Sequence, residues 1–102
     1  MGELTKVALT KDIVSGQAVA VEAQGHRIAI FNVNGVFHAI GDTCTHRGGP
    51  LSQGKVEGWT VTCPWHGAKF DIRTGNVLTP PAPAPVPSYK VVVEDGEIKL
   101  EL

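Results

Sequence analysis

Two short stretches, CTHRGGPLSQG at residues 44–54 and CPWHGAKFD at residues 63–71, decide how this sequence is interpreted. Each begins with a cysteine that is followed by a histidine: Cys44 by His46, and Cys63 by His66. The chain contains no other cysteine, and residues 47–62 separate the two pairs. Thiolates and imidazoles are ligands that zinc and iron take in proteins. The pattern therefore predicts a metal site built from two loops.

Zinc is one candidate for this site, because structural zinc ions accept two cysteines and two histidines in a tetrahedron. Zinc fingers of that type usually take both cysteines from one turn and both histidines from another, whereas each loop here holds one of each. Gly48, Gly49 and Gly67 also allow the loop backbone to turn sharply and to bring N–H groups close to a bound group. Such donors suit the anionic sulfides of an iron–sulfur cluster. The residues favour a cluster and leave zinc as the alternative.

The paired loops resemble those of Rieske iron–sulfur proteins, in which cysteines hold one iron of a [2Fe–2S] cluster and histidines the other. The agreement includes the loop prolines, Pro50 and Pro64. The resemblance implies one Rieske-type [2Fe–2S] cluster with these ligands: Cys44 and Cys63 on the inner iron, His46 and His66 on the outer iron. It also implies an all-β Rieske fold, in which a sandwich-like basal part of antiparallel sheets carries a small cluster-binding part at about residues 42–75.

The sequence departs from the respiratory-chain branch of this family. Proteins of that branch have an additional cysteine in each loop, joined in a disulfide, and two hydroxyl side chains that donate to the cluster sulfurs. This chain has Gly49 and Trp65 in place of the cysteines, and Ala68 and Phe70 in place of the hydroxyl residues. Without those donors the reduced cluster is less stabilised. We therefore expect a potential in the lower part of the Rieske range, which runs from about −150 to +300 mV.

The sequence is instead similar to the small Rieske ferredoxins of bacterial ring-hydroxylating dioxygenase systems. This resemblance implies a one-electron carrier and not an enzyme, with an NAD(P)H-dependent flavin reductase as donor and a terminal oxygenase as acceptor. The chain has no phosphate loop or dinucleotide fingerprint, so the reductase is expected to be a separate protein. Two alternatives stay open: a small Rieske-like subunit of a nitrite reductase and, from another class, a zinc-stabilised structural or interaction module.

His26 and His38 lie outside the paired loops. A mononuclear iron site of the oxygenase type needs two histidines and a carboxylate on one face of the metal. No spacing in the sequence joins these two histidines to an Asp or Glu in that way. We interpret both as ordinary surface or half-buried residues.

Length and charge limit the other possibilities. The chain has 102 residues, which fits a single domain spanning residues 1–102. Its formal net charge is −1, so neither nucleic acid nor an anionic membrane is an expected partner. Residues 1–16 hold no apolar core of signal-peptide length, and no later run reaches transmembrane length. We expect a cytoplasmic protein.

Strand and turn patterns predict the all-β class independently of the loops. Short β-rich runs occur at residues 18–23, 27–33, 36–42 and 57–63, and two further hairpins are predicted at 68–78 and 89–102. Asn34-Gly35 and Asp95-Gly96 are dipeptides that tolerate the positive φ of tight hairpin turns. The proline-rich stretch PPAPAPVP at residues 80–87 cannot join the middle of a sheet. We interpret it as a stiff loop on the same fold, and the resemblance to Rieske proteins implies that it covers the cluster from a third side.

Overall fold

A computed structural model describes residues 4–43, 49–65, 67–79 and 84–102 of the protein. In these ranges the chain consists mainly of β-strands, with two single-turn 3-10 helices and no helix that is long and apolar enough to cross a membrane. The elements in chain order are β1 (Leu4–Leu9), η1 (Thr10–Asp12), β2 (Ala18–Ala23), β3 (His26–Val33), β4 (Val36–Gly41), η2 (Leu51–Gln53), β5 (Lys55–Glu57), β6 (Thr60–Thr62), β7 (Lys69–Asp71), β8 (Val77–Thr79), β9 (Ser88–Glu94) and β10 (Glu97–Glu101).

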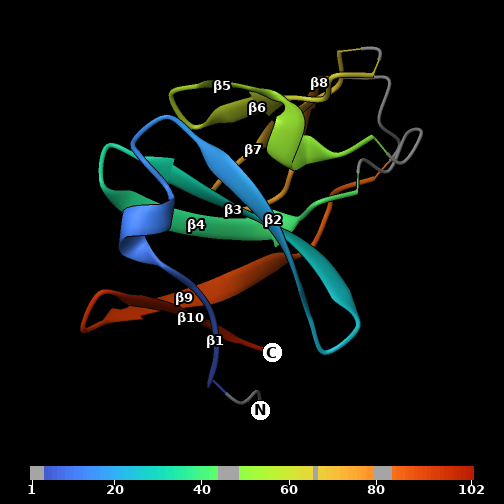
Figure 1. Ribbon diagram of the computed structural model, residues 1–102. Coiled ribbons are helices and arrows are strands. Elements are labelled where there is room, and N and C mark those ends of the chain that lie inside the picture. Colours follow the sequence, from blue (N-terminus) through green and yellow to red (C-terminus); the bar gives the residue numbers. More distant parts are fainter. Residues whose placement is uncertain (1–3, 44–48, 66, 80–83) are drawn as a thin grey trace.

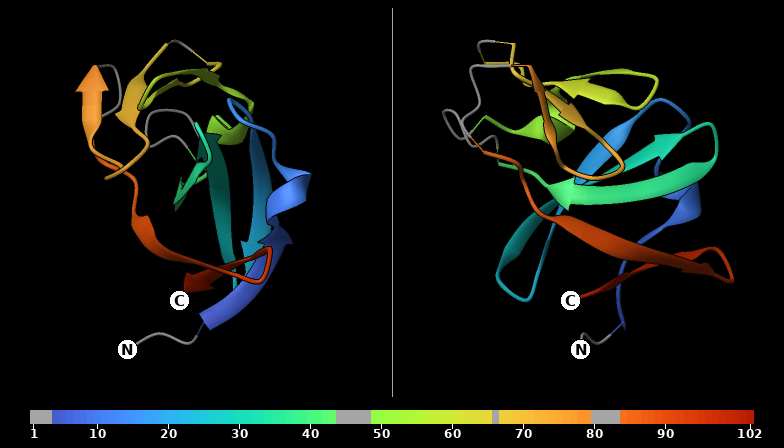
Figure 2. Two further views of the ribbon diagram at one scale, coloured as in Figure 1. Left: turned by 90° about the vertical axis from the view of Figure 1, so that its left-hand side faces the viewer. Right: turned by 180° about the vertical axis from the view of Figure 1, so that it is seen from behind.

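The strands form two antiparallel sheets, which confirms the fold class predicted from the sequence. One sheet has the order β1-β10-β9-β4-β3-β2, and the other has the order β5-β6-β7-β8. The four-stranded sheet lies on one side of β3 and β4, and β9 and β10 lie on the other side (Figures 1 and 2). The larger sheet forms the base of the molecule, and the smaller sheet carries the second of the two candidate ligand loops.

Strand β3 is buried on both faces, with six consecutive buried residues at 28–33. Ile28 and Ile30 point into a cluster that we call the lower core, which also contains Ile13, Ala39, Ile98 and Leu100. Ala29, Phe31 and Val33 point into the upper core, which also contains Ile40, Leu51, Val61, Cys63, Ala68, Phe70, Ile72 and Val86. Successive side chains of a strand alternate between its faces. Burial on both faces therefore requires the apolar run Ile28–Phe31, which most antiparallel strands lack. The buried polar residue that follows, Asn32, donates its side-chain amide to the carbonyl oxygen of Ile13 over 2.8 Å.

The hairpin turns confirm the dipeptide predictions. Asn34 and Gly35 have φ values of 53° and 86° between β3 and β4. Asp95 and Gly96 have φ values of 51° and 75° between β9 and β10. Because these turns fix the register of the strands, Ile40 reaches the upper core while Ala39 reaches the lower core.

Two details differ from the sequence predictions. The run at 57–63 is not one strand: Glu57 ends β5, Gly58 takes a φ of 58°, and only Thr60–Thr62 form β6. The turn at Gly58 and Trp59 joins two short paired strands here. Strand β1, which pairs with β10, was not predicted because its polar and apolar residues do not alternate regularly. A shift in register between Lys6 and Ala8 accounts for that irregularity.

The end of the proline-rich stretch lies against the same fold. Residues 80–83 are outside the described residues, but Val86 is buried in the upper core. Its amide donates to the carbonyl oxygen of Gly75 over 2.9 Å, and the carbonyl oxygen of Pro87 accepts from the amide of Gly41 over 2.8 Å. Gly75 has a φ of 80°, and a Cβ there would collide with the carbonyl oxygen of Val86. The stretch thus returns to β9 between the β7–β8 turn and the end of β4.

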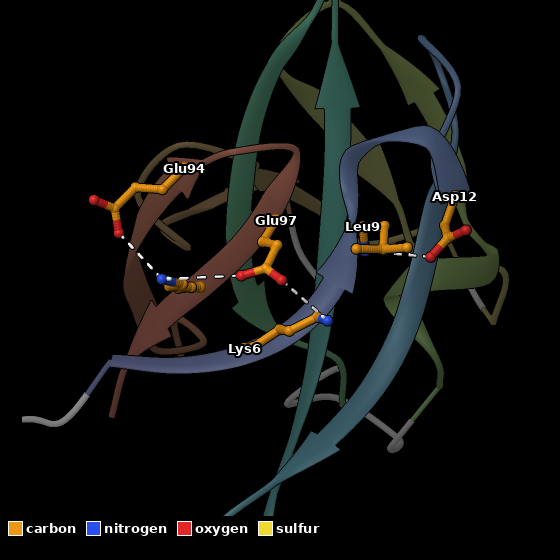
Figure 3. Close-up of polar contacts among 6 residues, drawn as sticks. Lys6, Leu9, Asp12, Glu94 and Glu97 are labelled. Carbon is orange, nitrogen blue, oxygen red and sulfur yellow. Dashed lines mark hydrogen bonds and ion pairs between the residues drawn. The ribbon is translucent and has the colours of Figure 1, made fainter.

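Ion pairs lie on the surface of strands β1, β9 and β10. Lys6 of β1 contacts Glu97 of β10 over 3.2 Å, and Lys99 contacts Glu94 of β9 over 3.2 Å (Figure 3). At the start of η1 the amide of Leu9 donates to the Asp12 carboxylate over 3.2 Å (Figure 3). Exposed pairs of this kind contribute about 0–1 kcal/mol each, so burial of β3 outweighs them in stabilising the base.

His38 of β4 lies at a junction between the two sheets. Its ring meets Trp59 of the β5–β6 turn edge-on, with 5.1 Å between ring centroids, and the Arg73 guanidinium lies 5.2 Å from the Trp59 ring. The Nε2 atom of His38 is buried and has no hydrogen-bond partner among the described residues. Burial lowers the pKa of His38, the nearby Arg73 charge lowers it further, and Asp71 opposes them. The folded protein therefore favours the neutral imidazole.

We predict that this junction makes stability depend on pH. Because the pKa of His38 lies below 6.5 in the folded state, the unfolded chain binds more protons as pH falls through 6.5. The free energy of unfolding should be highest above that pH and should decrease as pH falls towards the folded-state pKa. His38→Gln should flatten this dependence between about pH 7 and pH 5, measured by denaturant unfolding at each pH. His26→Gln, at an exposed position on β3, is the matched control; equal slopes for both variants and the parent protein would contradict the prediction.

Candidate metal centre

Cys63 is the one predicted ligand that lies within the described residues; Cys44, His46 and His66 lie outside them. It follows β6 directly, and its side chain is only 2% exposed. The Cys63 amide donates to the carbonyl oxygen of Ala68 over 2.7 Å, a hydrogen bond that closes the base of the second loop. Burial in the upper core and this closure hold the sulfur at the base of the second loop.

The surroundings of Cys63 Sγ fit a metal-bound thiolate. The amide of Trp65 donates to the sulfur over 3.4 Å, which favours the charged form of a ligating cysteine. The backbone of the first loop also comes close to the sulfur, because a Cβ built on Gly49 would lie 2.8 Å from it. Glycine at position 49 thus leaves the space around the sulfur open. The soft sulfur donor and the close backbone suit iron in an iron–sulfur cluster.

The first loop is closed at its base by Asp42, a carboxylate that is 1% exposed. Its Oδ1 accepts from the amide of Ser52 over 2.7 Å, and its Oδ2 lies 3.4 Å from the Arg27 guanidinium. The backbone carbonyl of Asp42 accepts from the amide of Leu51 over 2.7 Å. Asp42 therefore joins both ends of the segment that contains Cys44 and His46 and satisfies donors at the start of η2.

Two further features fix the base of the same loop. Thr43 and Pro50 form an isolated antiparallel bridge just outside the predicted ligands. Leu51, which follows, is fully buried in the upper core next to the residues that surround Cys63. Both candidate loops thus start from one apolar cluster, which brings their bases together.

Sequence reasoning did not identify the role of Asp42, although the residue stood at the predicted start of the cluster-binding part. The available signal was an acidic residue at the end of an apolar strand, where burial has to be compensated by hydrogen bonds. Its partner Ser52 is ten positions away, and neither residue forms a recognised motif with the other.

The remaining histidines occupy the positions expected for ordinary residues. His26 is exposed on β3, with its ring centroid 5.9 Å from that of Tyr89, and His38 is partly buried against Trp59. Within the described ranges, no three His, Cys, Asp or Glu side chains gather closely enough to hold a metal ion.

Comparison with known proteins identifies the family. The family model described as "Rieske [2Fe-2S] domain" matches residues 3–90 of the chain. The chain belongs to the Rieske [2Fe–2S] family. Its cofactor is accordingly one Rieske-type [2Fe–2S] cluster, and the zinc alternative is wrong.

The p-cumate 2,3-dioxygenase system ferredoxin component of Pseudomonas putida is 38% identical over 102 residues, covering 98% of this chain and 86% of that protein. The 3-phenylpropionate/cinnamic acid dioxygenase ferredoxin subunit of Escherichia coli (strain K12) is 41% identical over 92 residues, covering 89% and 86% of the two chains.

Solved structures have the same fold. The ferredoxin of carbazole 1,9a-dioxygenase from Nocardioides aromaticivorans IC177 superimposes with a TM-score of 0.92 at 28% identity, covering 96% of both chains. A ferredoxin in complex with the oxygenase of carbazole 1,9a-dioxygenase gives a TM-score of 0.89 at 32% identity, covering 96% of this chain and 92% of that one. The terminal oxygenase of carbazole 1,9a-dioxygenase from Novosphingobium sp. KA1 gives a TM-score of 0.87 at 28% identity. That match covers 99% of this chain but only 30% of the oxygenase chain. A putative nitrite reductase small subunit gives 0.84 at 19% identity, which shows a shared fold alone.

We predict that the closure made by Asp42 supports the Rieske loops. Asp42→Ala leaves the Ser52 amide without its acceptor and should destabilise the holoprotein by about 2–4 kcal/mol. Asp42→Asn keeps an oxygen acceptor and should cost less. Loss of the visible cluster absorbance in guanidinium chloride measures both effects. Asp12→Ala is the control, because that carboxylate also accepts a backbone amide but is exposed; equal midpoint shifts for Asp12→Ala and Asp42→Ala would count against the role assigned to Asp42.

Proposed function

We propose that this protein is the ferredoxin of a multicomponent ring-hydroxylating dioxygenase. It accepts one electron from an NAD(P)H-dependent flavin reductase and passes it to a terminal oxygenase. The observation that carries this proposal is the extent of the matches. The chain spans 96% of a dioxygenase ferredoxin but only 30% of a terminal oxygenase. The chain thus matches a dioxygenase ferredoxin over almost all of that protein, whereas its match to the terminal oxygenase covers less than a third of that enzyme.

We assign the cluster ligands to the residues of the paired loops. Cys44 and Cys63 hold the inner iron, and His46 and His66 hold the outer iron. The burial of Cys63 supports its place on the inner iron, because this residue lies in the upper core and not at the surface. When bound, a cluster with two neutral imidazoles in place of two thiolates accepts a single electron at a higher potential than an all-cysteine cluster.

The residues around Cys63 support a potential in the lower part of the Rieske range. Ala68 and Phe70 are both fully buried in the upper core, and neither carries a hydroxyl. The Trp65 amide is a backbone donor to Cys63 Sγ. Side chains without hydroxyl donors stabilise the additional negative charge of the reduced state less than serine and tyrosine would.

The setting of the protein belongs to the same proposal. An NAD(P)H-dependent donor and a terminal oxygenase act in the cytoplasm, and reduced thiolate ligands are compatible with that compartment. Aromatic substrate binds to the oxygenase and not to the carrier. The outer iron with His46 and His66 would be the contact point, since electron transfer weakens steeply with distance.

The ligand assignment can be tested by comparing one proposed ligand, His66, with a histidine outside the paired loops, His26. His66→Ala should abolish the Rieske absorption and electron paramagnetic resonance spectra, whereas His26→Ala should leave both unchanged. Iron and acid-labile sulfide analysis of the parent protein should give two of each per chain. A parent-like spectrum for His66→Ala would refute this ligand set.

Electron transfer tests the function itself. The protein should be reduced by NADH in the presence of the reductase of the p-cumate or the phenylpropionate system and should be reoxidised by the matching oxygenase. Stopped-flow absorbance at the cluster bands measures both half-reactions. The holoprotein should support product formation when it replaces the natural ferredoxin, and His66→Ala should not. A holoprotein that exchanges no electrons with either reductase or either oxygenase would contradict the proposal.

We predict that a hydroxyl beside Cys63 raises the potential. Ala68→Ser adds a donor within the upper core, and a hydrogen bond that strengthens on reduction favours the reduced state. We expect a rise on the order of 50 mV, because about 59 mV corresponds to a tenfold change for a one-electron couple. Ala39→Ser adds the same group to the lower core and should leave the potential unchanged in redox titrations monitored by circular dichroism. An unchanged or lower potential for Ala68→Ser would be the contrary result.

A further inference from the structure

Gly49 and Trp65 bring the two ligand loops into direct contact. A Cβ on Gly49 would lie 3.1 Å from both Cγ and Cδ2 of Trp65, and 2.8 Å from Cys63 Sγ. The inner edge of the indole therefore rests on the bare backbone of the other loop, next to the sulfur. Gly49 itself is buried.

Trp65 nevertheless remains 49% exposed. A tryptophan that served only to fill the core would be enclosed, and one that served only as a surface contact would not touch the opposite loop. The indole lies close to Gly49, the Trp65 amide donates to Cys63 Sγ, and about half of the residue's surface faces solvent. The exposed residue Trp65 thus lies next to a sulfur that belongs to an almost fully buried cysteine.

We propose that Trp65 and Gly49 form an apolar clasp between the two ligand loops, which we call the Trp65–Gly49 clasp. The indole presses on a position where no side chain fits, holds the first loop against Cys63 and excludes water from the sulfur. Trp65 is therefore a positioning residue: it slows release of the cluster and lowers the reduction potential. The inference rests on the proposed ligand set, because Cys63 must be a ligand for the clasp to act on the cluster.

Both effects follow from the geometry. Opening the loops is the first step by which an external chelator could reach the irons, and removal of the ring removes a contact that opposes it. Water that enters beside the sulfur stabilises the more negative reduced state, so solvent exposure raises the potential. A purely global contribution to stability would not shift the potential in this way.

The experiment follows cluster loss from the holoprotein in excess iron chelator, by the decay of the visible absorbance, together with a redox titration. Trp65→Ala should release iron about tenfold faster and should have a more positive potential, because a clasp contact worth about 1.4 kcal/mol corresponds to that factor. Trp65→Phe keeps an aromatic Cγ and a Cδ over Gly49 and should retain most of the parent behaviour. Gly49→Ala should also release iron faster, since its Cβ would displace the sulfur or the ring.

Trp59→Ala is the matched control, because Trp59 is a partly exposed tryptophan in the β5–β6 turn with no part in the clasp. It should leave the potential unchanged even if overall stability falls.

If Trp65→Ala keeps the parent release rate and potential while still passing electrons, the clasp is refuted and the proposed function stands. If the parent protein holds no cluster, the proposed function itself fails. Should Trp65→Ala assemble no cluster, Trp65→Leu against Trp65→Phe decides: equal release rates for the two overturn an aromatic clasp, and a faster rate for Leu supports it.

Discussion

Burial of β3 on both faces is the constraint on which the rest of the structure depends. Side chains from one face complete the lower core with β10, and side chains from the other face complete the upper core beneath the four-stranded sheet. Because interiors are packed closely, a shift of β3 would disturb both clusters at once. The upper core includes Cys63 and Leu51, one from the base of each candidate ligand loop. The position of the metal centre is thus set by the same packing that unites the two sheets.

Above this core, the loops are held by a few directed contacts. Asp42 binds Ser52 and Leu51 across the base of the first loop, and Cys63 binds Ala68 across the second. An electron carrier gains from such fixed surroundings, because polar groups that are already oriented do not have to rearrange when charge arrives. The buried carboxylate serves this purpose only while its hydrogen bonds are satisfied, since an unpaired buried charge is strongly unfavourable.

The sequence was informative where chemistry is local and uninformative where it depends on distant partners. The Cys–His pairs predicted the family, and Asn34-Gly35 and Asp95-Gly96 predicted two turns, because each signal lies within a few residues. Strand β1 could not be found in this way, since its pairing with β10 joins opposite ends of the chain. The role of Asp42 and the contact between Gly49 and Trp65 likewise depend on how separate loops approach one another. No short pattern encodes that approach.

The distribution of burial also explains why this chain suits a carrier. The buried apolar side chains of the described residues lie in the two cores, where Phe31, Phe70 and Leu51 are fully enclosed. Near the ligand loops, by contrast, Pro64, Trp65 and Gly67 are exposed. An electron needs no substrate-sized cavity; it needs a protected metal centre that a partner can approach closely. Transient electron-transfer contacts are small, so one exposed loop region can serve a reductase and an oxygenase in turn. A closely packed base and the exposed residues Pro64, Trp65 and Gly67 fit both requirements within a single short chain.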